Sequence, residues 1–197
     1  TGPRDLTLLT AYEEELIPLS QSLAKRRAAL IQEISPLLQR YYEALSMGRE
    51  QVGLSYETEA LREDFPEYYL SMRPKDFATK NCNAGIHKDD FDFRIDAHPL
   101  RKLGSQGQQK SFIIALKLAQ FALYEKAKGE KPLLLLDDIF DKLDEERIGM
   151  LMQLVSQGNF GQLFITDARP ERSKEILNSL QVEVFYFFLE NGVISKK

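Results

Sequence analysis

The sequence lacks most features of secreted, membrane-spanning or strongly basic proteins. It holds one cysteine, Cys82, and no tryptophan, so an internal disulfide is excluded and a reducing compartment is favoured. No apolar run approaches the roughly 20 residues of a membrane helix, and no signal pattern opens the chain. With 26 Lys and Arg against 30 Asp and Glu, the net charge is −4, which does not by itself indicate nucleic-acid binding. We therefore expect a cytoplasmic protein with no membrane partner.

The residues that are present suffice for a folded chain. The 197 residues are 43% hydrophobic and 28% charged, which predicts one or two domains. Lys and Arg gather locally at 25–27, 101–102 and 126–131, where phosphate groups could bind, although a solvated surface is the simpler interpretation of each cluster. The chain begins Thr1-Gly2-Pro3 without an initiator Met, so we expect a fragment of a longer gene product.

A long amphipathic helical pattern occupies residues 5–46. Its apolar residues recur at intervals of three and four, as in a coiled coil. Two runs share this spacing: Leu9, Tyr12, Leu16, Leu19 and Leu23, then Leu30, Ile34, Leu37, Tyr41 and Leu45. Pro18 and Pro36 each remove a backbone donor, so kinks or breaks are expected there. The pattern predicts an arm that packs on a partner helix or on its own return, and it predicts equally well a helical hairpin in a core.

The segments after this helix predict a strand and a second helix. Residues 51–57 alternate as in a strand, 59–72 favour a helix, and 73–83 are typical of a loop. We interpret residues 1–80 together as a helical arm or lid region with a short strand.

The stretch that follows holds a weak metal-site pattern and another strand. The second half of residues 85–95 alternates and predicts a strand, and 96–99 predict a turn. His87 lies near Asp89 and Asp90, but with no second histidine nearby the pattern does not favour a metal site.

Residues 104–111 nearly match the Walker A phosphate loop. The match fails at Gln109, where that loop requires a glycine so that the backbone can wrap the phosphate closely. We therefore reject a Walker A loop here. A helix is expected from about Ser111 to Lys128. Its buried face is predicted to hold Ile113, Leu116, Ala119 or Gln120, and Leu123.

Four leucines run directly into two aspartates at residues 133–138. The apolar run predicts a fully buried strand in the middle of a parallel sheet. Ligands bind at the carboxyl ends of such strands. Asp137 is therefore a candidate to hold a hydrated Mg²⁺, and Asp138 to orient or deprotonate a water, as in the Walker B arrangement. The alternative is that Asp138 or Asp141 caps the following helix.

The remainder of the chain predicts alternating helices and strands. Helices are expected at 145–157 and 171–180, and strands at 162–167 and 182–189. A turn is expected at 190–192, and the apolar residues Val193 and Ile194 follow it. The order strand, helix, strand, helix, strand predicts an α/β sheet with crossover connections.

Several of these motifs, in this order, resemble the second half of an ABC-type ATPase head. The stretch Ser105–Lys110 resembles the signature loop, the aspartates Asp137 and Asp138 resemble Walker B and its catalytic acid, and Leu143-Asp144 resembles the D-loop. Within that superfamily the chain resembles the RecF family. Four stretches carry this likeness: 42–48, 85–90, 104–110 and 135–144.

The likeness has departures. Where the family has Gly-Pro-His-Arg, this chain has Ile86 and Lys88, so a bidentate arginine fork is lost there. ABC transporters place a sensor histidine where this chain has Thr166 and Asp167. No Walker A loop occurs in the 197 residues, so the chain resembles the C-terminal half of the family, with residues 81–197 as the ATPase subdomain.

The resemblance implies an α/β fold with a mostly parallel sheet, flanking helices and a helical arm. It implies ATP and Mg²⁺ as cofactors and an ATP-dependent homodimer in which the signature loop contacts the partner's nucleotide. The residues of that loop are Ser105, Gln106, Gly107, Gln108, Gln109 and Lys110. Asp137 would hold Mg²⁺ through water, Asp138 would be catalytic, Leu143 and Asp144 would lie at the dimer seam, and Thr166 and Asp167 would occupy the sensor position.

For function, the resemblance implies a clamp on single-strand/double-strand DNA junctions that works with recombination mediator proteins and associates with the nucleoid. A weak ATPase is expected of the full-length dimer and none of this chain alone. Two alternatives stay open: an SMC-type chromosome-structure head, which the short arm disfavours, and a non-enzymatic interaction domain.

Overall fold

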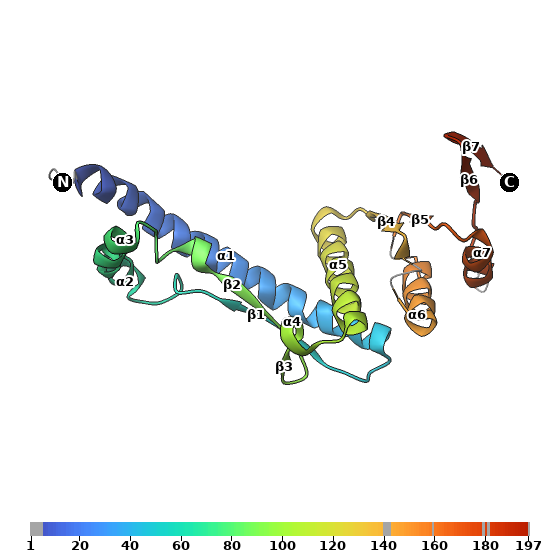
Figure 1. Cartoon of the computed structure of the whole chain (residues 1–197), viewed down its shortest axis with the longest axis horizontal. Helices are drawn as coiled ribbons and strands as arrows, with labels where there is room; N and C mark the ends of the chain where they lie inside the picture. The colour runs from blue at the N-terminus through green and yellow to red at the C-terminus, as the bar shows by residue number, and fades with distance from the viewer. Residues whose placement is uncertain (1–5, 140–142, 159, 179, 181, 197) are drawn as a thin grey trace. The chain divides into compact units, whose positions relative to one another are not determined.

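The computed structural model describes residues 6–139, 143–158, 160–178, 180 and 182–196 (Figure 1). Contacts divide the chain into two units. The first comprises Thr1–Gln39 and Gln51–Leu103, and the second comprises Arg40–Glu50 and Gly104–Lys197. The boundaries of these units differ from the predicted division of the chain into a helical arm region, 1–80, and an ATPase subdomain, 81–197. That functional division stays a prediction.

Helix α1 runs without interruption over Leu6–Ser46. The prediction of breaks at Pro18 and Pro36 is wrong. Each proline deprives the carbonyl four residues earlier, at Glu14 and Gln32, of its helical donor. All four residues are exposed, so water can replace the missing donors.

The second run of the predicted stripe on α1 is confirmed in part, because Ile34, Tyr41 and Leu45 are buried, but the first run is wrong. Tyr12, Leu16 and Leu19 are all exposed, whereas Ile17 and Ala24 are buried. The two inward residues join a core cluster that also contains Ala60, Phe65, Tyr69 and Ala84. In this part of α1 the side that packs against α2 and its flanking loops is therefore the one that carries Ile17 and Ala24. It is less apolar than the adjacent leucine-rich side, which is exposed.

The first unit also contains an antiparallel sheet. Strand β1 (Val52–Glu57) pairs with β2 (Asp90–Ile95), which pairs with the short β3 (His98–Pro99). Both predicted strands are confirmed, and they lie along α1 (Figure 1). A four-residue helix, α4 (Leu100–Leu103), ends the unit.

Two short helices replace the predicted single helix and loop. Helix α2 covers Phe65–Ser71 and α3 covers Arg73–Thr79. The prediction of an irregular segment at 73–83 is wrong for its first half. Each helix has a proline in its first two positions, where the missing N–H costs no hydrogen bond, so Pro66 and Pro74 start helices rather than end them.

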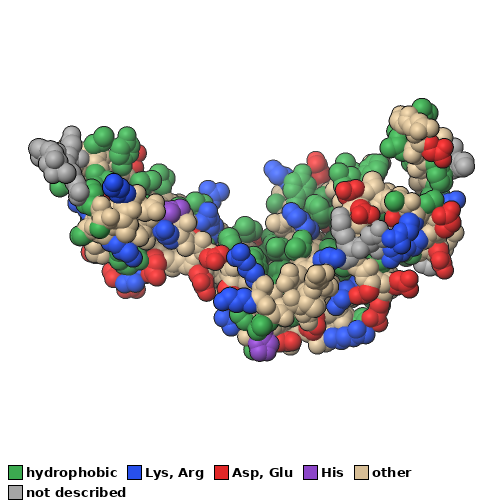
Figure 2. All heavy atoms as spheres, in the orientation of Figure 1, with side chains coloured by type: hydrophobic (Ala, Val, Ile, Leu, Met, Phe, Trp, Pro, Cys, Tyr) green, Lys and Arg blue, Asp and Glu red, His purple; other side chains and the backbone are tan. Residues whose placement is uncertain are grey.

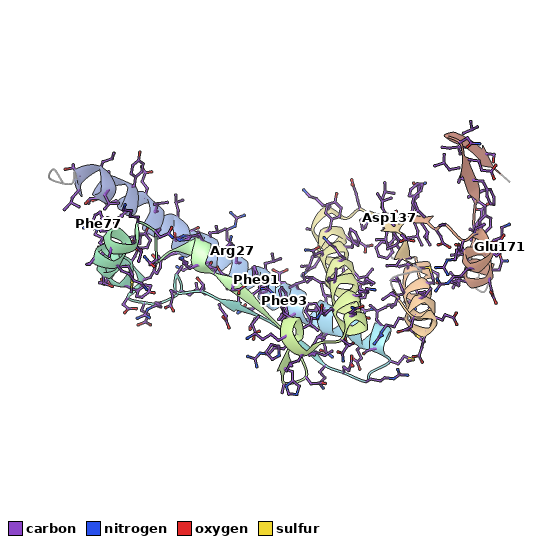
Figure 3. All side chains as sticks on the ribbon, in the orientation of Figure 1. Arg27, Phe77, Phe91, Phe93, Asp137 and Glu171 are labelled. Carbon is purple, nitrogen blue, oxygen red and sulfur yellow. The ribbon has the colours of Figure 1, made fainter. Side chains whose placement is uncertain are left out.

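The loop before β2 is fixed by a buried carboxylate. Asp89, whose side chain is 4% exposed, accepts hydrogen bonds from Tyr56 Oη and from Arg27 Nη1, the latter at 3.0 Å. Arg27 lies on α1 near the β2 aromatic residues (Figure 3). His87, in the short 3₁₀ helix η1 (Ile86–Lys88), has Nε2 2.9 Å from the Cys82 carbonyl oxygen. Within the described residues no group of His, Cys, Asp or Glu has a metal-binding arrangement.

Helix α5 covers Gln106–Lys128 in the second unit, and it begins five residues before the predicted start at Ser111. The predicted buried face is wrong in part, because Ile113 is 59% exposed while Phe112, Ala115 and Leu118 are buried. The helix turns this side inward, and the Phe112 ring lies 6.3 Å from the ring of Tyr42.

The parallel pair predicted in the second unit is confirmed. Strand β4 (Leu133–Asp137) pairs in parallel with β5 (Gln162–Thr166), and α6 (Glu145–Ser156) lies between them in sequence as the crossover. The expectation that β4 is buried on both faces is wrong for this chain: Leu134 is buried, but Leu133 and Leu135 are 57% and 70% exposed. Figure 2 shows hydrophobic side chains gathered on the surface over α5 and β4.

The last segment forms a helix and a separate hairpin. Helix α7 covers Pro170–Asn178. Strand β6 (Phe187–Glu190) begins later than predicted and pairs antiparallel with β7 (Val193–Lys196). The predicted turn is confirmed, with Asn191 and Gly192 both at positive φ, as a tight hairpin requires. Among the helices that the structure describes, none combines the length and the apolar character needed to cross a membrane.

Candidate functional site

The carboxyl end of the parallel pair brings together two predicted site residues. Asp137 ends β4 and lies opposite Thr166, the last residue of β5. The Thr166 hydroxyl donates to Asp137 Oδ1 at 2.5 Å. Asp137 is exposed (Figure 3), so the threonine orients its carboxylate toward solvent at the sheet edge where ligands bind in α/β proteins.

Asp138 turns the chain directly after the strand. Its φ is 50°, in the left-handed region that aspartate tolerates better than most residues. Its backbone N–H lies 3.2 Å from both the Thr166 carbonyl oxygen and Oγ1. The two adjacent carboxylates are therefore held on one turn that β5 fixes in place. Ile139 then enters the core, and residues 140–142, which include Asp141, lie outside the described residues.

Thr166 and Asp167, the two residues of the predicted sensor position, have different hydrogen-bond partners. The Ser173 hydroxyl, on α7, donates to Asp167 Oδ2. Asp167 Oδ1 is buried and has no hydrogen-bond partner among the described residues. Thr166 thus belongs with Asp137, whereas Asp167 ties the end of β5 to α7.

The predicted signature stretch is the first turn of α5 rather than a free loop. Ser105 is the N-cap: its Oγ accepts from the Gln108 N–H at 3.2 Å, and its own N–H donates to Gln108 Oε1 at 2.6 Å. Gln109 Nε2 donates to the Gly104 carbonyl at 2.9 Å. Ser105 and Gln106 are exposed, and Lys110 is half-buried. A 23-residue helix thus presents its capped, partly positive end at the surface.

Two residues that sequence reasoning missed hold this turn in place. Gln108 Nε2 donates to Glu50 Oε1 at 2.6 Å, and the buried Tyr42 donates to Glu50 Oε2, also at 2.6 Å. Glu50 lies 58 positions before Gln108, so no local pattern pointed to it. The pattern Ser-x-x-Gln at 105–108 was a visible capping-box signal that could have located the helix start.

The predicted D-loop residues meet the predicted signature stretch through an arginine. Asp144 is the N-cap of α6, accepting from the Arg147 N–H at 2.9 Å and from Arg147 Nη1 at 2.7 Å. The backbone N–H of Arg147 holds the Asp144 pKa below its ordinary value. Leu143 is buried. Asp144 rather than Asp138 caps α6, and Asp141 of the same alternative lies outside the described residues.

Arg147 also reaches α5. A Cβ added to Gly107 would lie 2.7 Å from Arg147 Nη1, so the guanidinium lies directly against the glycine. The site residues thus form two groups, each held by its own contacts. The strand-end group is Asp137, Asp138, Thr166 and Asp167. The helix-start group is Ser105–Lys110 with Leu143 and Asp144, to which the structure adds Glu50 and Arg147.

Several known proteins are similar to this chain in sequence. The chain is 41% identical over 192 residues to the DNA replication and repair protein RecF of Cytophaga hutchinsonii, a match covering 98% of this chain and 51% of the relative. It is 44% identical over 175 residues to RecF of Flavobacterium johnsoniae, covering 89% of this chain and 49% of the relative. The chain therefore spans about half the length of the curated relatives that it matches. No family model matches it.

Solved structures show the same fold. The recombination mediator protein RecF–ATP of the RecFOR pathway aligns with a TM-score of 0.76 at 21% identity, covering 100% of this chain and 52% of that one. A structure from work on ATP-driven dimerization and DNA-stimulated activation of SMC ATPases aligns with a TM-score of 0.54 at 15% identity, covering 88% of each chain. These likenesses confirm the predicted α/β fold.

Proposed function

Because the chain belongs to the RecF family of DNA replication and repair proteins, we propose that it is the C-terminal part of an ATP-dependent DNA clamp for recombinational repair and replication-fork maintenance. One observation carries the nucleotide part of this proposal. Thr166 fixes Asp137 and Asp138 on a single turn at the carboxyl end of the parallel strands, where a phosphate-bound cation and an attacking water would be received.

Each nucleotide site is shared between two subunits in this proposal. One subunit supplies Asp137 and Asp138 together with a Walker A loop from sequence outside these 197 residues. The other supplies the N-terminal turn of α5, where Ser105 and the free N–H groups of the helix suit the γ-phosphate. ATP then joins two heads, and hydrolysis separates them.

The donor set of the strand end fits a hydrated Mg²⁺. Asp137 offers exposed carboxylate oxygen, and Thr166 keeps that group oriented. Mg²⁺ commonly binds one or two carboxylates while waters and substrate phosphates complete its shell, so a three-ligand protein cluster is not needed. When bound, the ion would neutralise phosphate charge. Asp138, next to it, would orient the water that attacks the terminal phosphate.

The DNA part of the proposal rests on the names of the relatives. We propose that the closed dimer holds single-strand/double-strand junctions, acts with recombination mediator proteins, and works in the cytoplasm in association with the nucleoid. An SMC-type head is the second candidate, supported by the fold likeness at 15% identity.

The decisive variant is Asp138→Asn in the full-length protein. Asparagine is isosteric and tolerates the left-handed backbone at φ 50°, so the fold should persist while water activation is lost. We expect ATP turnover to fall by roughly 10²-fold or more, in the range of lost general-base catalysis. Glu145→Gln, which neutralises an exposed carboxylate on α6, is the matched control and should keep the wild-type rate. Unchanged turnover in Asp138→Asn would contradict the catalytic role of Asp138, and absence of ATP turnover in the wild-type protein would support the non-enzymatic interaction domain.

A further inference from the structure

Gly107 has no conformational reason to be glycine. It lies in the first turn of α5 and does not have the positive φ found at five other glycines. Alanine is the better helix former at such a position. What excludes a side chain here is space, because a Cβ would lie 2.7 Å from Nη1 and 3.6 Å from Cζ of Arg147.

The guanidinium that fills this space is itself held. Asp144 Oδ2 lies 2.7 Å from Arg147 Nη1, and Asp144 Oδ1 accepts the Arg147 N–H as the cap of α6. The Arg147 side chain is only 21% exposed. Moving the guanidinium away from Gly107 would therefore strain or break its contact with Asp144.

The same two helix starts are joined through a third segment. Arg49 donates to both carboxylate oxygens of Glu146, each at 3.2 Å, which ties this segment to α6. Its neighbour Glu50 accepts from Gln108 at 2.6 Å, which ties it to α5. Arg147 also contacts Gly107 directly, so a shift of either helix start would be passed to the other.

We propose that Arg147 is a positioning residue that couples the D-loop carboxylate of Asp144 to the signature turn at Gly107. This inference rests on the proposed function, since the turn is where ATP of a partner head would be received. A nucleotide arriving at Gly107 meets the guanidinium and thereby changes the position of Asp144 at the seam between heads. Gly107 leaves the space that the Arg147 guanidinium occupies, so a side chain at position 107 would displace the guanidinium.

A double-mutant cycle in the full-length protein tests the coupling. The variants are Gly107→Ala, Arg147→Ala and both together, with Arg147→Lys to keep the charge without the fork and Gly149→Ala as control. Gly149 lies in α6 with open space around its Cβ position. Each variant is assayed for its melting temperature and for the ATP concentration that gives half-maximal turnover.

We expect Arg147→Ala to raise the half-saturating ATP concentration roughly tenfold, as for a lost hydrogen bond to a charged group, with a nearly unchanged melting temperature. Gly107→Ala should raise it too and lower the melting temperature. Adding Arg147→Ala to Gly107→Ala should restore the melting temperature and raise the half-saturating concentration no further. Gly149→Ala should keep the wild-type half-saturation, and Arg147→Lys should fall between wild type and Arg147→Ala.

Two results would overturn the inference. The first is a half-saturating ATP concentration in Arg147→Ala equal to that of the wild type. The second is a double variant in which the fold-changes of the two single substitutions in this concentration simply multiply. If the wild-type protein shows no ATP turnover, the proposed function fails by itself. The melting cycle then decides the Gly107–Arg147 coupling, because additive melting shifts would contradict it and non-additive shifts would support it.

Discussion

The substitution Gln108→Glu tests the polar network that fixes the first turn of α5, the predicted signature stretch. In the wild type, Gln108 accepts from Ser105 through Oε1 and donates to Glu50 through Nε2, both at 2.6 Å. A glutamate keeps the first contact but replaces the donor with a carboxylate oxygen. Two half-buried carboxylates would then face each other where a charge-assisted hydrogen bond had been.

The cost follows from two parts. Loss of a hydrogen bond to a charged group removes roughly 1.5–3 kcal/mol. Two like charges about 4 Å apart near a protein surface repel by up to about 4 kcal/mol, although rotation of both side chains relieves most of it. We expect the free energy of unfolding to fall by about 3 kcal/mol at pH 7.5. The loss should shrink toward pH 5, because a proton shared between the carboxylates removes the repulsion.

Urea unfolding followed by circular dichroism measures this loss. The charge-swapped pair Glu50→Gln with Gln108→Glu restores a donor facing a carboxylate and should recover most of the stability. Gln106→Glu, on the same turn but exposed, is the control and should cost little, because an anion at a helix start is favourable. Wild-type stability in Gln108→Glu, or a swapped pair no better than the single variant, would refute the network described above.

Three further predictions concern the arm and the DNA. Arg27→Met should lower the free energy of unfolding by about 3 kcal/mol, because it leaves the buried Asp89 carboxylate without its cation. Adding Asp89→Asn should recover part of this loss in urea titrations. An unchanged urea midpoint in Arg27→Met would contradict the prediction. Burial, and next the hydrogen bond to Asp89, raise the pKa of Tyr56. The folded state therefore holds this proton more tightly, so stability should fall as pH rises above about 10, and Tyr56→Phe should flatten that fall. Filter binding of the full-length protein with ATP should show DNA affinity that declines steeply with salt; absent or salt-independent binding would count against the clamp.

Local patterns predicted the elements of the sheet edge well. The leucine run followed by two aspartates located β4 and its end, whereas the contact between Thr166 and Asp137 was found only in the structure. The packing face of the N-terminal half of α1 was missed because two stripes compete there, whereas Ile34, Tyr41 and Leu45 of the second half are buried as predicted. The stripe chosen by the fold includes Glu13, which is buried only because Arg73, 60 residues later, binds it.

The rest of the site depends on contacts that sequence spacing does not encode. Glu50 reaches Gln108, and Arg49 reaches Glu146 from 97 residues away. Arg147 meets Gly107 only because the chain, after passing through β4, returns so that the start of α6 lies against the start of α5. The exposed side chains of Leu133 and Leu135 also contradict a pattern typical of fully buried strands, since one face of β4 is open in this chain.

The most direct test of the shared-site proposal is Mg-ATP binding by calorimetry. The titration is made on this chain alone and then on this chain mixed with a separately produced N-terminal half of the protein. We predict no binding by the chain alone and binding on mixing, because the Walker A loop comes from outside these 197 residues. Binding by the chain alone would contradict this prediction and would mean that residues 104–111 act as a phosphate loop despite Gln109.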